Sequence, residues 1–167
     1  MENIMSLNSA NLNLRYDQKG LDLTEHSEDA GGPHLKAYWD PTGHVWTCGY
    51  GHTKDVDANT TCTPELADTW LASDVAWATY VVKNHVSAPL TQYEFDALVD
   101  FVFNVGAENF IHSTLLAKIN RKDYLGAAGE FSKWILSGGE VLPGLRSRRA
   151  AEAALFRLGI PNADIHP

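Results

Sequence analysis

The chain has 167 residues, of which 44% are hydrophobic and 20% are charged, so it suits one globular domain with a real core rather than a disordered segment. Its formal net charge of −8 disfavours nucleic acid as a partner, because binding to phosphates rests on Lys and Arg. No apolar run approaches the roughly 20 residues of a membrane helix, and no secretory signal is visible at the N-terminus. Synthesis in a reducing cytoplasm, with no cofactor, is therefore the expectation.

The first part of the chain predicts a short helix and a small sheet. Residues 1–16 are polar and Asn-rich, and we expect an N-terminal extension before a single domain over 17–167. Asp17 is a candidate N-cap for a helix over 17–28, and the DAGGP sequence that follows breaks it. Strand formers on either side of the DPTG turn signal predict an antiparallel sheet over 35–53.

The remainder reads as helical. Thr63 followed by Pro64 starts a long helix that runs to about residue 84. Thr91 and Glu94 form a capping box for a helix that ends at Gly106. Its apolar stripe contains Phe95, Leu98, Val99, Val102 and Phe103. Further helices are expected over 113–120, 123–135 and 145–159.

These elements predict an α+β architecture in which a small antiparallel sheet lobe is joined by the long helix to a helical lobe. A ligand would bind in the cleft between the two lobes. Glu28 and Asp40, on separate elements, would give this cleft two carboxylates, the minimal equipment for cutting a glycosidic bond. Glu28 would be the protonated acid, Asp40 the ionised base, and the Thr47 hydroxyl would hold a water.

Several segments strongly resemble the phage-type lysozyme family, whose members include the T4-lysozyme-like muramidases and endolysins. They are GLDLTEHSE at 20–28, LKAYWDPTG at 35–43, VWTCGYGHT at 45–53, LTQYEFDALVDFVFNVG at 90–106, STLLAKIN at 113–120 and GGEVLPGLRSRRAAEAALF at 138–156. Together they cover about residues 20 to 158. The resemblance implies a lysozyme-like fold and cleavage, with inversion, of the β-1,4 bond between N-acetylmuramic acid and N-acetylglucosamine in peptidoglycan.

Carried over residue by residue, the resemblance implies catalytic roles for Glu28, Asp40 and Thr47. It suggests sugar contacts at Thr53, Phe103 and Thr114. It also implies a monomer that accumulates in the host cytoplasm and reaches the cell wall once a membrane-permeabilising partner, a holin, has acted. No metal site is expected, because neither an HExxH motif nor a CxxC pair is present.

The sequence departs from the family pattern around the predicted acid. The step from Glu28 to Asp40 is longer than the family's usual step, because DAGGPH lengthens the connection. The residue before the acid is Ser27 rather than an apolar one. Glu25 and Asp29 are therefore rival candidates for the acid.

Other features have simpler interpretations. Arg146, Arg148, Arg149 and Arg157 could meet an anionic ligand, but a solvated helix face is the simpler prediction. Cys48 and Cys62 are expected to be free thiols, with a bridge open to them in an oxidising space if the geometry allows it.

Two alternative functions stay open. A non-catalytic peptidoglycan-binding or virion structural protein could keep the fold, although such a protein would have no use for the set of Glu28, Asp40 and Thr47. A lytic transglycosylase would use one acid and no attacking water, so Asp40 and Thr47 argue against it.

Overall fold

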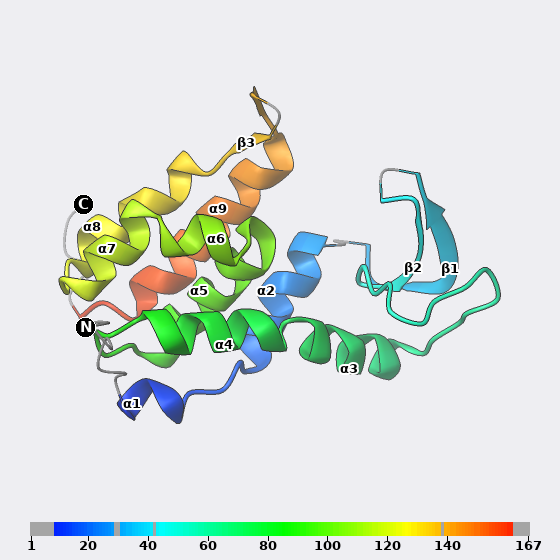
Figure 1. Ribbon diagram of the computed structural model, residues 1–167, viewed down its shortest axis with the longest axis horizontal. Helices are drawn as coiled ribbons and strands as arrows, with labels where there is room; N and C mark the ends of the chain where they lie inside the picture. Colours follow the sequence, from blue (N-terminus) through cyan, green and yellow to red (C-terminus); the bar gives the residue numbers. More distant parts are fainter. Residues whose placement is uncertain (1–8, 29–30, 42, 138, 162–167) are drawn as a thin grey trace, which may run out of the picture. The chain divides into compact units, whose positions relative to one another are not determined.

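The computed structural model describes residues 9–28, 31–41, 43–137 and 139–161. The chain divides into two compact units (Figure 1), which we call the sheet unit, Leu21–Ala76, and the helical unit, residues 1–20 with 77–167. Helix α2 (Gln18–Glu28) begins in the helical unit and continues into the sheet unit. The Asp17 carboxylate accepts hydrogen bonds from the amides of Lys19, at 2.9 Å, and Gly20, at 3.4 Å, which confirms the predicted N-cap.

The sheet unit is built on an antiparallel hairpin of β1 (His34–Asp40) and β2 (Val45–Gly49). His44, in the connecting turn, has the left-handed φ of 51° that short hairpin turns demand. Residues 60–62 pair with the other edge of β1, because the amide of Ala37 donates to the Thr60 carbonyl at 2.9 Å. The predicted small antiparallel sheet is therefore confirmed.

The helix predicted over residues 64–84 is in fact two helices. Helix α3 (Pro64–Asp74) starts at the N-cap Thr63, whose hydroxyl accepts from the Leu66 amide at 3.2 Å, as the sequence predicts. Val75 then caps α3, and α4 (Ala76–His85) follows. At Val75 the ψ of −7° lies outside the α-helical range, although its amide still bonds to the Leu71 carbonyl. Neither glycine nor proline marks this break, so local sequence signals do not reveal it.

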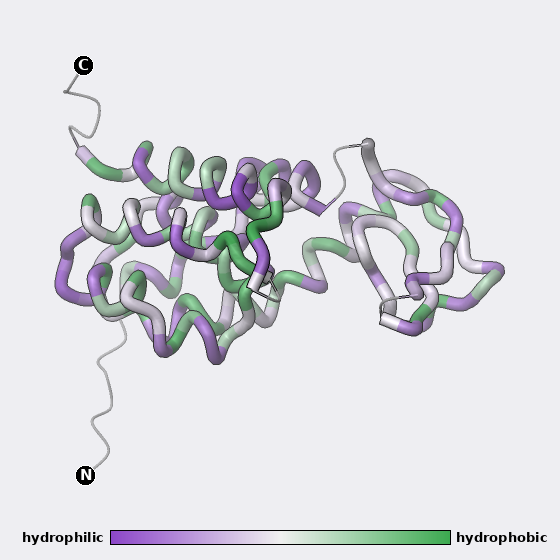
Figure 2. The backbone as a smooth tube through the Cα atoms, turned by 90° about the horizontal axis from the view of Figure 1, so that it is seen from above, coloured by the Kyte–Doolittle hydropathy of each residue, from purple (hydrophilic) through white to green (hydrophobic). Residues whose placement is uncertain are grey.

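The core of the helical unit is α5 (Gln92–Val105), which packs against α9 (Pro143–Leu158). The remaining elements of this unit are α1 (Ser9–Leu12), α6 (Ala107–Ile111), α7 (Thr114–Asn120), α8 (Tyr124–Glu130), the 3-10 helix η1 (Phe131–Lys133), β3 (Leu136–Ser137) and β4 (Glu140–Val141). Hydrophobic and hydrophilic stretches alternate along its helices (Figure 2), which is typical of helices that bury one face. Helix α5 also buries charged residues, because Asp96 and Asp100 are as inaccessible to solvent as Phe95.

Asn11 ties helix α1 to the rest of the helical unit. Its side chain is fully buried, donating to the Ala88 carbonyl at 2.8 Å and accepting from the Leu90 amide at 2.9 Å. The segment predicted as an N-terminal extension thus contributes a buried, hydrogen-bonded side chain.

Among the described residues, no helix combines the length and the apolar character that a membrane crossing requires.

The capping box of α5 has the predicted geometry. The Thr91 hydroxyl accepts from the Glu94 amide at 3.3 Å, and the Glu94 carboxylate accepts from the Thr91 amide at 2.8 Å. Replacing Thr91 with Ala is expected to lower the free energy of unfolding by about 1 kcal/mol, because one amide at the helix start loses its acceptor. Urea denaturation would measure this, and an unchanged midpoint would show that the cap contributes nothing.

Asp96 is a buried acid that makes stability depend on pH. Its side chain is inaccessible, and one oxygen accepts from Gln92 Nε2 at 2.8 Å while the other has no partner among the described residues. Burial, and next the neighbouring Asp17 carboxyl, raise the pKa of Asp96 to about 7. The folded protein therefore binds this proton more tightly than the unfolded chain, whose Asp pKa is near 3.9. The stabilisation is complete below that value and is lost as the pH rises through about 7.

We expect the wild type to gain about 3 kcal/mol more stability than the Asp96→Asn variant when the pH falls from about 8 to 5. Asn keeps the acceptor for Gln92 but cannot titrate. Urea unfolding of both proteins at the two pH values would measure this difference. Parallel pH dependences in the two proteins would show that Asp96 does not carry the effect.

Candidate active site

Glu28 is the last residue of α2, and its side chain is exposed. Thr24, one turn earlier on the same helix, is fully buried. Two residues that the sequence placed beside it, Asp29 and Ala30, lie outside the described residues, so the rival role of Asp29 is not addressed by the structure.

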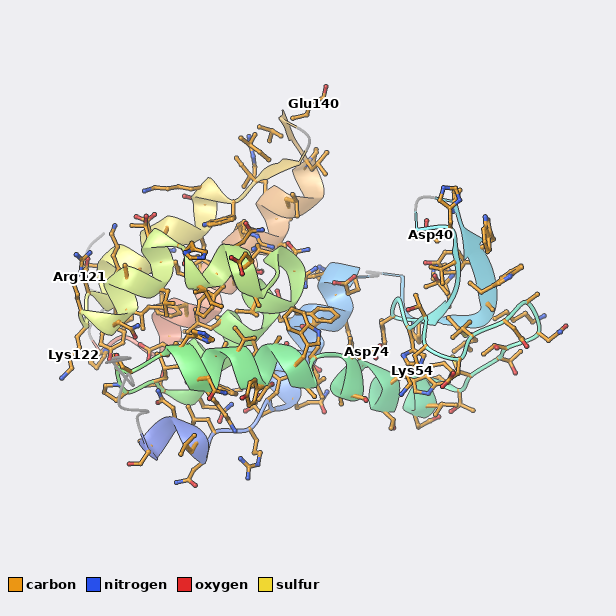
Figure 3. The ribbon with its side chains drawn as sticks, in the orientation of Figure 1. Asp40, Lys54, Asp74, Arg121, Lys122 and Glu140 are labelled. Atoms are coloured by element: carbon orange, nitrogen blue, oxygen red, sulfur yellow. The ribbon has the colours of Figure 1, made fainter. Side chains whose placement is uncertain are left out.

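Asp40 and Thr47 lie on one face of the β1–β2 hairpin. In the register Asp40 is opposite Val45, and Tyr38 is opposite Thr47. Cross-strand partners and alternate residues share a face, so Asp40 and Thr47 point to the same side of the sheet. Figure 3 shows Asp40 at the end of its strand, and a Cβ at Gly43 would lie 3.1 Å from its Oδ2, so a larger residue at position 43 would crowd this carboxylate.

Thr47 has an unusual environment for a hydroxyl group. The residue is only 4% exposed, and its Oγ1 has no hydrogen-bond partner among the described residues. A buried hydroxyl without a partner costs about 1–3 kcal/mol, so such groups are rare in folded proteins and call for an explanation. A role in holding a substrate or a water molecule would supply one.

Glu25, the other rival acid, lies one turn before Glu28 and is half-buried. Burial, and next the nearby carboxylates of Asp68 and Asp22, raise its pKa, while a hydrogen bond with Tyr50 opposes the rise. A raised pKa is what a general acid needs, so Glu25 remains the competitor that mutation must exclude.

The buried histidine of the GYGH segment, His52, has a structural environment. Its Nδ1 lies 2.8 Å from Asp74 Oδ2 at the end of α3, and its ring stacks on Trp70 with the centroids 4.6 Å apart. Its backbone exchanges two hydrogen bonds of 2.9 Å with Cys48 on β2. The histidine therefore holds the loop after β2 against α3.

The predicted sugar contacts fall in both units. Thr53 is exposed and follows His52 in the sheet unit. Phe103 and Thr114 belong to the helical unit, where Phe103 is half-buried beside Trp77, with ring centroids 6.3 Å apart, and Thr114 is the exposed first residue of α7. Their contact with sugar stays a prediction.

The arginine cluster is not the solvated face that the sequence favoured. Arg148 and Arg149 are buried, and only Arg146 and Arg157 are exposed. The prediction was wrong because buried carboxylates on other turns and helices pair with these side chains, which the sequence pattern does not reveal.

Among the described residues, no cluster of three or more His, Cys, Asp or Glu side chains could hold a metal ion.

Comparisons with known proteins show the family of the chain. Residues 28–152, which contain Glu28, Asp40 and Thr47, match the family described as phage lysozyme. An endolysin of Acyrthosiphon pisum secondary endosymbiont phage 1 is 42% identical over 147 residues, covering 86% of this chain and 98% of the relative. The endolysin of Salmonella phage P22 is 38% identical over 133 residues, 75% of this chain and 88% of that one.

Solved structures are similar over most of the chain. The muramidase domain of SpmX from Asticaccaulis excentricus has a TM-score of 0.77 and 35% identity, covering 86% of this chain and 97% of that one. A P22 lysozyme mutant has a TM-score of 0.76 and 34% identity, covering 86% and 98%. The predicted lysozyme-like α+β fold is therefore confirmed.

Proposed function

Because the chain belongs to the phage lysozyme family, we propose that Glu28, Asp40 and Thr47 are the residues with which it cleaves peptidoglycan. The chain is an endolysin-type lysozyme, a glycoside hydrolase of host cell lysis that acts on the cell wall. The bond it hydrolyses joins N-acetylmuramic acid to N-acetylglucosamine. The observation that supports the residue assignment best is the hairpin register, which gives Asp40 a common face with Thr47, whose buried hydroxyl has no partner within the described part of the chain.

Each residue has one task in the proposed reaction. Glu28 gives its proton to the glycosidic oxygen as the bond to the muramic acid C1 breaks. A water held by Thr47 Oγ1 attacks C1, and Asp40 takes the proton that this water loses. Attack by water on the face opposite to the leaving group inverts the configuration at C1. Both carboxyl groups return to their starting protonation states by exchange with solvent.

The remaining assignments extend this proposal. Thr53, Phe103 and Thr114 contact the sugar chain, and the enzyme acts as a monomer. It waits in the host cytoplasm and reaches the peptidoglycan after a holin has permeabilised the membrane. These assignments rest on the family resemblance rather than on a contact in the structure.

The test is the chemistry of the new chain ends. Purified sacculi are digested with the wild-type protein, and the soluble muropeptides are separated and identified by mass spectrometry. Reducing N-acetylmuramic acid ends are expected from a muramidase. Anhydro-muramic acid ends would place the protein among the lytic transglycosylases, and binding to sacculi without release would favour a non-catalytic role.

A further inference from the structure

The two cysteines of the chain, 14 residues apart in the sequence, meet in the sheet unit. Their Sγ atoms lie 3.5 Å apart, and both sulfurs also contact the His34 carbonyl oxygen, at 3.3 Å for Cys48 and 3.7 Å for Cys62. Cys48 is fully buried, whereas Cys62 is partly exposed. A disulfide needs sulfurs about 2.0 Å apart, so the remaining gap is small.

The backbone holds both cysteines in place without help from the sulfurs. Cys48 exchanges two hydrogen bonds of 2.9 Å with His52, and the Cys62 amide donates to the Leu35 carbonyl at 3.0 Å. These bonds keep Cys48 on β2 and Cys62 beside the far edge of β1. To bring the two sulfurs within bonding distance, the cysteine side chains have to rotate and the backbone has to shift slightly.

We propose that Cys48 and Cys62 form an intramolecular disulfide when the folded protein meets a disulfide oxidant such as oxidised glutathione. The Cys62 thiolate attacks one glutathione sulfur and releases the other glutathione as a thiolate. The Cys48 sulfur, having lost its proton, then attacks Cys62 Sγ and releases the second glutathione. The protein loses two protons and two electrons, and one glutathione disulfide becomes two glutathione thiols.

The environment of Cys62 makes the pair slow to react and hard to reduce again. Burial, and next the neighbouring Cys48, raise the pKa of the Cys62 thiol to about 11, so little thiolate is present near neutral pH. A thiol with a high pKa is also a poor leaving group, which makes the finished disulfide resistant to thiol attack. The two cysteines therefore stay reduced in a reducing compartment and form a lasting disulfide in an oxidising one.

The crosslink would act on the part of the sheet unit beside the proposed catalytic residues. Cys48 directly follows Thr47, and Cys62 directly precedes Thr63, the N-cap of α3. The closed loop contains His52 and Thr53. The main effect expected of the bond is to restrict the unfolded chain, which stabilises the folded unit. The formation of the bond does not depend on the proposed function.

The test compares one protein in two redox states. Reduced wild-type protein is incubated under native conditions with oxidised glutathione or with dithiothreitol, and intact mass, free thiols and the melting temperature are measured. We expect the oxidised sample to lose both thiols and two hydrogen atoms in mass and to melt about 5–10 °C higher than the reduced sample. Excess dithiothreitol, added after denaturation, should restore both thiols and the two hydrogen atoms in mass.

Two variants serve as controls. Cys48→Ala should stop at a glutathione adduct on Cys62, and the double variant Cys48→Ala with Cys62→Ala should melt at the same temperature under both treatments. Persistence of both wild-type thiols, a stable glutathione adduct on the wild type, a disulfide-linked dimer, or a bond that leaves the melting temperature unchanged or lower would each overturn the proposal.

Discussion

Replacing Glu28 with Gln is expected to lower the rate of peptidoglycan hydrolysis by about 10²- to 10⁴-fold, the usual contribution of a general acid. Gln has nearly the same shape as Glu but has no proton to give to the leaving oxygen. The side chain is exposed at the end of α2, so the variant should fold normally. Initial rates of turbidity loss from purified sacculi would measure the effect, with melting temperatures to confirm folding.

Glu25→Gln is the matched control, because it makes the same change one helical turn earlier. We expect its rate to stay close to that of the wild type. This control is important because burial and nearby carboxylates raise the pKa of Glu25, as a general acid requires. Loss of activity in Glu25→Gln together with a normal rate in Glu28→Gln would make Glu25 the acid and would contradict the assignment.

The largest expected effect on stability comes from Arg148→Met, which should lower the free energy of unfolding by about 3–5 kcal/mol. Arg148 is buried and forms a two-pronged pair with Asp100, with Nε to Oδ2 at 3.0 Å and Nη2 to Oδ1 at 2.8 Å. Met fills a similar volume but leaves the Asp100 carboxylate buried without its cation. Urea denaturation at neutral pH would measure the loss.

Two further variants isolate the cause of that loss. Arg146→Met changes an exposed arginine on the same helix and should shift stability by less than about 0.5 kcal/mol. Adding Asp100→Leu to Arg148→Met removes the orphaned carboxylate and should restore part of the lost stability. If adding Asp100→Leu lowers the free energy of unfolding further, the loss in Arg148→Met comes mainly from packing and not from the unpaired charge.

This ion pair belongs to a buried network that joins α5 to α9. Arg149 Nη1 lies 3.2 Å from Glu152 Oε2, its Nη2 donates to Asn104, and its guanidinium lies 4.9 Å from the ring centroid of Phe101. Burial, and next Asp100, raise the pKa of Glu152 well above its ordinary value. The network brings together residues far apart in the sequence, so local patterns could not reveal it.

The parts of the fold that the sequence predicted well are those set by local chemistry. The Thr91 and Glu94 capping box and the Thr63 cap each act within a few residues and have the expected geometry, and the strands on either side of the DPTG sequence pair as predicted. The buried Asn11 depends on packing against a distant segment, and the break at Val75 has no glycine or proline to mark it. No local propensity distinguishes such residues from ordinary helix or loop positions.

The candidate site was predictable to a similar extent. The strand formers around DPTG predict a hairpin, and the family resemblance selects Asp40 and Thr47 on it. Their common face comes from the register that the structure shows, which the sequence did not predict. The choice of Glu28 over Glu25 rested on the family resemblance, because both are acids on the same helix. The burial of the Thr47 hydroxyl could not be read from the sequence, since it depends on what packs over the strand.

The most direct test of the central claim is the fate of water during cleavage. Sacculi are digested in water enriched in heavy oxygen, and the muropeptides are analysed by mass spectrometry, with the anomeric configuration of fresh products followed by NMR. We predict one heavy oxygen at each new reducing N-acetylmuramic acid end, formed with inverted configuration, and none from Glu28→Gln. Anhydro ends without heavy oxygen, or retained configuration, would contradict direct attack by a water that Asp40 and Thr47 hold.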